Sequence, residues 1–267
     1  MDHIALSCSD VAQGAALLGE VGYHVRFVER DLFNHPAKRP FLRRYAATHS
    51  VAYCGLEGAI SIELTRHEAP LGQGVSPYQV LLAGAPDDVS PWQESLPPSW
   101  ASVWRRAIGC GEPVAARWHP FSAQLWYDAQ SHVAPSGSVQ ALLLPVANRA
   151  ASEAFWVSGL GCRVVGRSTE EDAWGWVRLS FSGPVTSWSV EVVLAEVDRR
   201  GGLPHLDDPG FPCLAVISNR LARDMETALR AGAREASEEF PLEVGGKTLK
   251  IVLVRGPDGE LVEMLGF

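Results

Sequence analysis

The stretch GPDGELVEML, residues 256–265, decides the fold of this chain. Its first residues have turn chemistry, and an alternating strand follows them. Alternation places Glu263 on the same face as Leu261 and Leu265, so a carboxylate lies on an otherwise apolar strand face. Glu263 therefore points either to water at a sheet edge or into a site.

The elements that precede this stretch also occur at the other end of the chain. Residues 2–9 alternate like a strand, residues 10–21 have apolar side chains at helical spacing, and residues 23–29 are extended again. In the last copy, FPCLAVIS (211–218) predicts a strand and NRLARDMETALRAG (219–232) a helix, before the final hairpin. The two ends of the chain are thus copies of one strand–helix–strand unit.

Two more copies lie between these ends. Residues 138–197 repeat the order clearly, and residues 77–128 repeat it more weakly. Because one unit cannot bury a sheet face alone, the units are expected to pair. The predicted fold class is α+β, with four βαβββ units forming two paired, curved mixed sheets and the helices outside. The polar stretch at 134–138 predicts a boundary between a domain of residues 1–133, whose second unit is degenerate, and a domain of residues 138–267.

Composition limits the classes of partner. The 267 residues are 46% hydrophobic and 20% charged, which is typical of a folded globular protein. A formal charge of -8 argues against nucleic acid and anionic membranes. Five cysteines without a CxxC pair indicate reduced thiols and a cytoplasmic protein. We expect a small-molecule partner, no nucleic acid and no membrane, and a homodimer is among the expected assemblies.

One basic run departs from this acidic balance, between Arg26 and Arg44. It also contains Arg30, Lys38, Arg39 and Arg43. Two interpretations stay open at this point: a solvated loop, or a lid that attracts an anionic substrate.

DHIAL at residues 2–6, Asp10 seven positions after His3 at a helix start, and GPDGELVEM at 256–264 together resemble the vicinal oxygen chelate superfamily. This superfamily contains glyoxalases, extradiol dioxygenases, epimerases and the bleomycin and fosfomycin resistance proteins. The resemblance covers nearly the whole chain as a fold signal. It implies that paired units face each other across a cleft, which commonly binds a divalent metal through residues of the first and last strand of each unit.

Strand register identifies the residues at these implied ligand positions. On the first strands, His3 has Cys213 as its counterpart in the last unit, while the middle units offer Gln79 and Ala141 or Leu142. On the last strands, the equivalent residues are Glu63, Gln124, Glu191 and Glu263. Each glutamate on its own is explained equally well as part of a solvated strand face.

Two pairings of the units stay open. If consecutive units pair, the C-terminal cleft has Glu191 and Glu263 but lacks the histidines that extradiol dioxygenases use for iron, so ordinary ring cleavage is disfavoured. If the first unit pairs with the last, one cleft gathers His3, Glu63 and Glu263, with the Cys213 thiol nearby. That set suits one divalent metal, Fe, Mn, Zn, Ni or Co.

The second pairing, slightly preferred, gives roles to the candidate residues. His3, Glu63 and Glu263 are the predicted metal ligands, and a carboxylate of Glu63 or Glu263 that leaves the metal would serve as a catalytic base. The predicted substrate-binding residues are His49, Tyr53 and Glu191.

Two functions from different classes follow. The first is a metal-dependent glyoxalase-like enzyme, a lyase, isomerase, epimerase or oxygenase acting on a small oxygen-rich metabolite. The alternative is a metal-free small-molecule binding or resistance protein of the bleomycin-resistance type. The alternative is favoured by the missing ligands of the middle units and by the tryptophans, which offer flat apolar contact area.

Overall fold

The computed structural model describes residues 1–68, 76–85, 89–91, 99–119, 121, 123–128, 137–170, 172, 174–181, 190–198 and 203–267. The first unit contains β1 (His3–Ser7), α1 (Val11–Glu20), β2 (His24–Phe33), the 3₁₀ helix η1 (Pro36–Phe41), β3 (Thr48–Gly55) and β4 (Ser61–His67). The second contains β5 (Gln79–Ala83), β6 (Val89–Pro91), α2 (Ser99–Ile108), β7 (Pro113–Trp118) and β8 (Ala123–Asp128).

The third unit contains β9 (Val139–Val146), α3 (Arg149–Ala154), the π-helical turn η2 (Phe155–Gly159), β10 (Arg163–Arg167), β11 (Trp176–Phe181) and β12 (Val190–Glu196). The fourth contains β13 (Gly210–Ile217), α4 (Leu221–Arg230), β14 (Glu235–Ala236), β15 (Phe240–Val244), β16 (Lys247–Arg255) and β17 (Leu261–Gly266). Among the described residues, no helix is both long enough and apolar enough to cross a bilayer.

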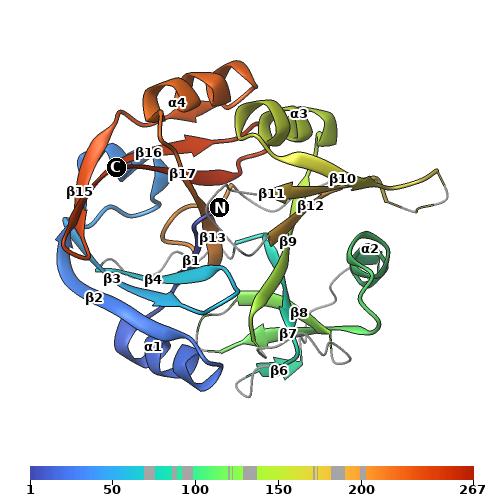
Figure 1. The fold of residues 1–267 in the computed structure, drawn as a ribbon, viewed down its shortest axis with the longest axis horizontal. Coiled ribbons are helices and arrows are strands. Elements are labelled where there is room, and N and C mark those ends of the chain that lie inside the picture. Colours follow the sequence, from blue (N-terminus) through green and yellow to red (C-terminus); the bar gives the residue numbers. More distant parts are fainter. Residues whose placement is uncertain are drawn as a thin grey trace.

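The strands form two mixed sheets that lie side by side (Figure 1). Sheet A has the order β14-β16-β17-β13-β1-β4-β3-β2, with β15 paired to β16, and sheet B has the order β10-β11-β12-β9-β5-β8-β7-β6. Sheet A therefore combines the first and fourth units, and sheet B the second and third. The predicted α+β fold of four units in two paired sheets is confirmed.

The observed pairing is the second of the two that the sequence left open, with the first unit beside the fourth. Each sheet therefore takes strands from both halves of the chain, whereas the predicted division into residues 1–133 and 138–267 grouped consecutive units, and that division stays a prediction. All four first strands have a similar apolar pattern, so the sequence alone does not distinguish their partners. Most of the predicted boundary at 134–138 lies outside the described residues.

The two central strands of sheet A, β1 and β13, each pair in parallel with the last strand of their own unit. β1 runs antiparallel to β13, with His3 opposite Ala215. β4 runs parallel to β1 with Glu63 opposite Ala5, and β17 runs parallel to β13 with Glu263 opposite Ala215. The two glutamates thus occupy equivalent positions on either side of the central strand pair.

One apolar core connects the two sheets. The side chains facing it alternate along the strands: Ile4, Leu6, Ile62 and Leu64 from sheet A, and Val80, Leu82, Leu125 and Leu142 from sheet B. Residues of α1, η2 and α4 complete this core, and α4 lies beside α3 in Figure 1. Each fully buried leucine or isoleucine stabilises the fold by roughly 1.5–3 kcal/mol relative to an exposed one.

The GPDGE turn before β17 joins the two sheets. Asp258 accepts hydrogen bonds from the Asn148 backbone N–H (2.8 Å) and the Ser152 hydroxyl (3.3 Å) at the start of α3. Gly259 has a φ of 91°, and a side-chain carbon there would lie 2.4 Å from Leu203. Only glycine can adopt this positive φ and also fit against Leu203, so the glycine of the turn is required by the structure.

α2 covers a face of sheet B that is equivalent to the Glu63 and Glu263 face of sheet A. Its buried residues Trp100, Val103 and Trp104 pack with Leu81, Trp126, Ala141, Leu143 and Val193, whose neighbours along each strand face the shared core. In Figure 1, α2 lies apart from the other three α-helices, at the right. The apolar residues on this face of sheet B therefore bind a helix instead of lining an open cleft.

Candidate active site

Four adjacent strands of sheet A bring the predicted metal ligands together. Glu63 lies on β4, His3 on β1 and Glu263 on β17, with β13 between the last two strands. The His3 Nε2 atom is 3.8 Å from an oxygen of Glu63 and 3.9 Å from an oxygen of Glu263. The three ligand atoms all lie within 4.8 Å of one another. We call these three residues the triad.

Asp2 and Tyr53 orient the triad histidine. The Nδ1 atom of His3 is 2.9 Å from the Asp2 carboxylate, which also accepts a hydrogen bond from the Tyr53 hydroxyl at 3.1 Å. The His3 side chain is only 4% exposed. Burial lowers the pKa of His3, but the Asp2 hydrogen bond and the charges of Glu63, Asp2 and Glu263 outweigh burial and raise it to about 9.

The opposite ring nitrogen of His3 has no hydrogen-bond partner. Its Nε2 atom is buried and, among the described residues, unpaired. A buried polar atom without a partner costs about 1–3 kcal/mol, so its direction toward two carboxylate oxygens indicates a ligand position.

The two triad carboxylates are held differently. The Thr65 hydroxyl donates a hydrogen bond to Glu63 at 3.1 Å, which fixes one oxygen of Glu63. Burial raises the pKa of Glu263 and the Glu63 charge raises it further, while the Lys38 and His3 charges lower it. Two buried carboxylates that lie close together repel each other, which favours protonation of one of them unless a cation lies between them.

A cavity of about 380 Å³ opens beside the triad. Its apolar walls include Leu242, Val244, Leu249 and Leu265, and its charged or aromatic lining includes Arg26, Phe27, Lys38, Tyr53 and Lys247. The rings of Phe27 and Tyr53 are stacked, with centroids 5.5 Å apart. The cavity therefore combines a polar floor with apolar walls, as small-molecule sites commonly do.

Two histidines and a lysine line a second part of this cavity. His49 on β3 and His67 on β4 are opposite each other in the strand register, and their rings lie 6.1 Å apart. Burial, with the Lys38 charge as the next cause, lowers the pKa of His49 to about 2 and that of His67 to about 4. Both rings are therefore neutral at physiological pH.

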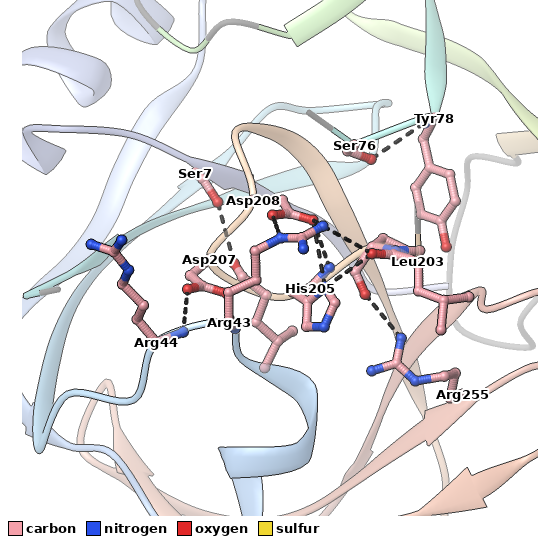
Figure 2. Close-up of polar contacts among 12 residues, drawn as sticks. Ser7, Arg43, Arg44, Ser76, Tyr78, Leu203, His205, Asp207, Asp208 and Arg255 are labelled. Atoms are coloured by element: carbon pink, nitrogen blue, oxygen red, sulfur yellow. Dashed lines mark hydrogen bonds and ion pairs between the residues drawn. The ribbon is translucent and has the colours of Figure 1, made fainter. Parts of the chain in front are cut away.

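The segment between residues 203 and 208 closes this part of the cavity. Leu206 is a lining residue, and its carbonyl accepts hydrogen bonds from the Ser7 hydroxyl (3.3 Å) and the His67 Nε2 atom (3.2 Å). Asp207 accepts hydrogen bonds from the backbone N–H groups of Arg43 and Arg44, at 2.7 and 2.9 Å (Figure 2). The chain just after η1 is thereby fixed to the fourth unit.

Arg255 and Arg43 strengthen the same connection. The Arg255 guanidinium donates to the carbonyls of Pro204 (2.9 Å) and Pro40 (3.3 Å). Arg43 forms an ion pair with buried Asp208 (Figure 2). The C-terminal end of η1 is therefore held in place. The basic run predicted as either a loop or a lid contains this ordered segment, and its residues Arg26 and Lys38 line the cavity.

The equivalent positions of sheet B do not form such a site. Gln79 donates a hydrogen bond to Gln124 and accepts one from the Trp126 indole at 3.3 Å. Glu191 lies 3.4 Å from the Arg178 guanidinium and does not line the cavity. The structure thus places Glu191 away from the triad, in contrast to His49 and Tyr53, which line the same cavity as the triad.

The expected fourth position holds a buried cysteine. Cys213 lines the cavity beneath the triad, opposite Ala5 in the strand register. Burial, with the charges of Glu263 and Glu63, raises the pKa of its thiol well above the usual value. Its Sγ atom lies outside the compact cluster of ligand atoms, so Cys213 is a wall residue there.

Several site residues were missed in the sequence. His67 is four positions after Glu63 on the same strand face, a spacing that would have identified it. Asp2 is adjacent to His3 and had no separate signal. Lys38 was named in the sequence only as part of the basic run, because it lies in a short 3₁₀ helix between two strands and no periodicity predicts where such a side chain points.

The arrangement of paired units in two mixed sheets is shared with solved structures of other proteins. The chain matches glyoxalase I from Zea mays with a TM-score of 0.59 and 14% identity over 100% of this chain and 92% of that one. A point mutant of the same enzyme gives a TM-score of 0.61, 14% identity and the same coverage of both chains.

The fold is also similar to that of a Bacillus subtilis protein proposed to be a dioxygenase. That structure gives a TM-score of 0.54 at 10% identity, over 100% of this chain and 84% of the other. No protein-family model matches the sequence, and a search of curated proteins finds no match. The likeness to these structures establishes the fold, which agrees with the resemblance noted in the sequence.

Proposed function

We propose that this chain is a metal-dependent, glyoxalase-like enzyme that acts on a small oxygen-rich metabolite, with His3, Glu63 and Glu263 as the metal ligands. The observation that carries this proposal is the buried, unpaired His3 Nε2 atom, 3.8 and 3.9 Å from the two carboxylates. A small-molecule substrate is the proposed partner, and a cytoplasmic location is proposed because all five cysteines are free and buried.

The donor set fits a divalent ion. Two ligands bound at about 2.1 Å to one ion lie roughly 3.0–3.5 Å apart, so the distances of 3.8 and 3.9 Å from His3 to the two carboxylates need to shorten by less than about 1 Å. One imidazole and two carboxylates suit Fe, Mn, Zn, Ni or Co. The Asp2 carboxylate gives His3 the hydrogen-bonded orientation that metal-bound histidines commonly have.

The chemistry follows from what each side chain can do. A divalent metal at the triad would act as a Lewis acid and polarise a carbonyl oxygen of the substrate. Glu263 is the proposed base, because Thr65 holds Glu63 while no described residue donates a side-chain hydrogen bond to Glu263. Glu263 would remove a proton from the carbon beside the polarised carbonyl and return it to a neighbouring atom.

Proton transfer is favoured over oxygen chemistry by the ligand set. Non-haem iron oxygenases typically use two histidines and one carboxylate, whereas the triad has one histidine and two carboxylates. The second carboxylate supplies a base, which a lyase, isomerase or epimerase needs. An oxygenase therefore ranks behind these classes.

Solvent deuterium exchange tests the proposed reaction. The metal-loaded protein is incubated in D₂O with α-hydroxyketones and with thiol adducts of α-ketoaldehydes, and deuterium incorporation beside the carbonyl is followed by NMR. We expect exchange with wild type and with Glu191→Gln, and loss of at least a hundredfold with Glu263→Gln. Equal exchange by Glu263→Gln and wild type would reject Glu263 as the base.

The second candidate function is a metal-free binding protein. The stacked rings of Phe27 and Tyr53 support it, since they would contact a flat, apolar ligand. The tryptophans do not support it, because none of those in the described part of the chain lines the cavity. High-affinity binding of aromatic metabolites to protein that takes up no metal would favour this candidate.

A further inference from the structure

We propose that Lys38 forms a binding subsite for an anionic group, a carboxylate, of the substrate, at a distance from the oxygens that meet the triad. This inference deepens the proposed function, on which its full form rests, because it names the substrate class: a bifunctional acid with metal-binding oxygens in one part and a carboxylate in another. Four observations support it. Lys38 is buried, it forms no ion pair among the described residues, the charge of the cavity favours an anion, and η1 is held in place.

Lys38 is a buried cation that lines the cavity. The residue is 6% exposed, and its ammonium lies 5.8 Å from the centre of the Phe240 ring. Within the described part of the chain its ammonium forms no ion pair; its charge lowers the pKa of Glu263, but that carboxylate belongs to the triad. A buried charge without a counter-ion is strongly unfavourable, so an anion from outside the chain is the expected partner.

The residues next to Lys38 do not supply that counter-ion. His49 and His67 are 2% and 6% exposed, and the Nδ1 atom of each ring is buried without a hydrogen-bond partner. His67 donates through Nε2 to the Leu206 carbonyl, so its Nδ1 atom is an acceptor. This part of the cavity thus offers one cation and unpaired ring nitrogens, which suit the oxygen atoms and hydroxyl groups of a ligand.

The charge of the cavity also favours an anion. Three acidic side chains, Asp2, Glu63 and Glu263, and three basic side chains, Arg26, Lys38 and Lys247, line it. A divalent metal at the triad would leave a positive excess of two charges. Low-dielectric walls strengthen the attraction of such an excess for a carboxylate.

The distance between the two parts sets the size of the substrate. Glu63 and His67 lie on the same face of β4, four residues apart. At about 3.3 Å per residue, their backbone positions are roughly 13 Å apart. The Lys38 charge acts on Glu263 and lowers its pKa, so the charged groups lie closer than that, and a linker of about four to six carbon atoms is expected.

The position of Lys38 is fixed before ligand binds. η1 is tied to the fourth unit by Arg255, which donates to the Pro40 carbonyl at 3.3 Å. Arg43, just after η1, contacts Asp207 and Asp208 (Figure 2). An ordered cation loses little conformational entropy when it binds a ligand. The site therefore recognises its anion as a built feature of the fold.

Paired hydroxamates test the subsite on the metal-loaded protein. A hydroxamate binds the metal with two oxygens, and its far end carries either a carboxylate or a methyl group, across linkers of four to six methylenes. By calorimetry, we expect the best carboxylate-ended compound to bind wild type at least tenfold more tightly than its methyl-ended partner. Lys38→Met should abolish the preference, and Lys250→Met, which removes an exposed lysine that does not line the cavity, should keep it.

A metal-free comparison separates this inference from the proposed function. If no hydroxamate of either kind binds, the metal proposal fails, and the subsite is then measured with hexanoate against 1-hexanol. Tighter binding of hexanoate, lost in Lys38→Met, supports the subsite alone. Equal binding of the acid and the neutral ligand, or a preference that survives Lys38→Met, overturns it.

Stability provides a second measurement on the same variant. Ligand-free Lys38→Met lacks a buried charge that has no ion pair, so its melting temperature should lie above that of wild type. If Lys38 instead stabilises the fold, the variant should melt at a lower temperature than wild type. A fall in the melting temperature would therefore contradict the inference even if the variant binds no ligand.

Discussion

Asp2→Asn removes the charge that orients His3 while keeping the shape of the side chain. The Asp2 carboxylate accepts from both His3 Nδ1 (2.9 Å) and the Tyr53 hydroxyl (3.1 Å). The amide oxygen of asparagine can still accept one of these bonds, but it no longer increases the basicity of the ring. Loss of such an outer partner typically weakens metal binding 10–100-fold, or about 1.4–2.7 kcal/mol.

Competition with a chromophoric chelator measures this effect directly. Wild type, Asp2→Asn and Asp10→Asn are titrated with Zn²⁺ or Co²⁺ under identical conditions. Asp10 caps α1 and is a matched control, because asparagine caps helices as well as aspartate does. An Asp2→Asn protein with the metal affinity of wild type would refute the assignment of His3 Nε2 as a ligand oriented by Asp2.

Three further predictions concern the parts that support the site. Trp104→Ala should lower the free energy of unfolding by roughly 3–5 kcal/mol in a urea titration, because this buried ring fills the α2 face of sheet B, while metal uptake at sheet A stays unchanged. Arg43→Ala should lower it by roughly 1–3 kcal/mol, because Asp208 is left buried without its ion pair; an unchanged unfolding midpoint would contradict this. The pKa of His67 is lowered from 6.5 to about 4 by burial and by Lys38, so its neutral ring contributes stability above pH 6.5 that is lost as the pH falls toward 4, by up to about 3 kcal/mol. Urea unfolding of His67→Gln should show a shallower loss over this pH range, and identical slopes would reject the assignment.

Much of the fold could be predicted from the sequence because the units repeat. The alternation of apolar residues in strands, their spacing in helices and the GPDGE turn each depend on residues close together in the sequence. The sequence therefore predicts the four repeated units. The register of His3, Glu63 and Glu263 follows from the same local rule, and the structure brings these three residues together.

The remaining features depend on contacts between distant residues. The antiparallel pairing of β1 with β13 joins segments about two hundred residues apart, and both strands look alike as partners. Glu191 has the same strand position as Glu63, yet Arg178 pairs with it and α2 covers much of its face. The direction of Lys38 is set by η1 and its ties to Asp207 and Arg255, which no local pattern contains.

The most direct test of the account is the metal content of three proteins purified without chelator and then given each candidate divalent metal. We predict one ion per chain in wild type and in Glu191→Ala, which removes the equivalent glutamate of sheet B, and almost none in Glu263→Ala, with all three proteins folded by circular dichroism. A wild type that takes up no metal, or a Glu263→Ala variant that keeps a full equivalent, would contradict the assignment of the triad.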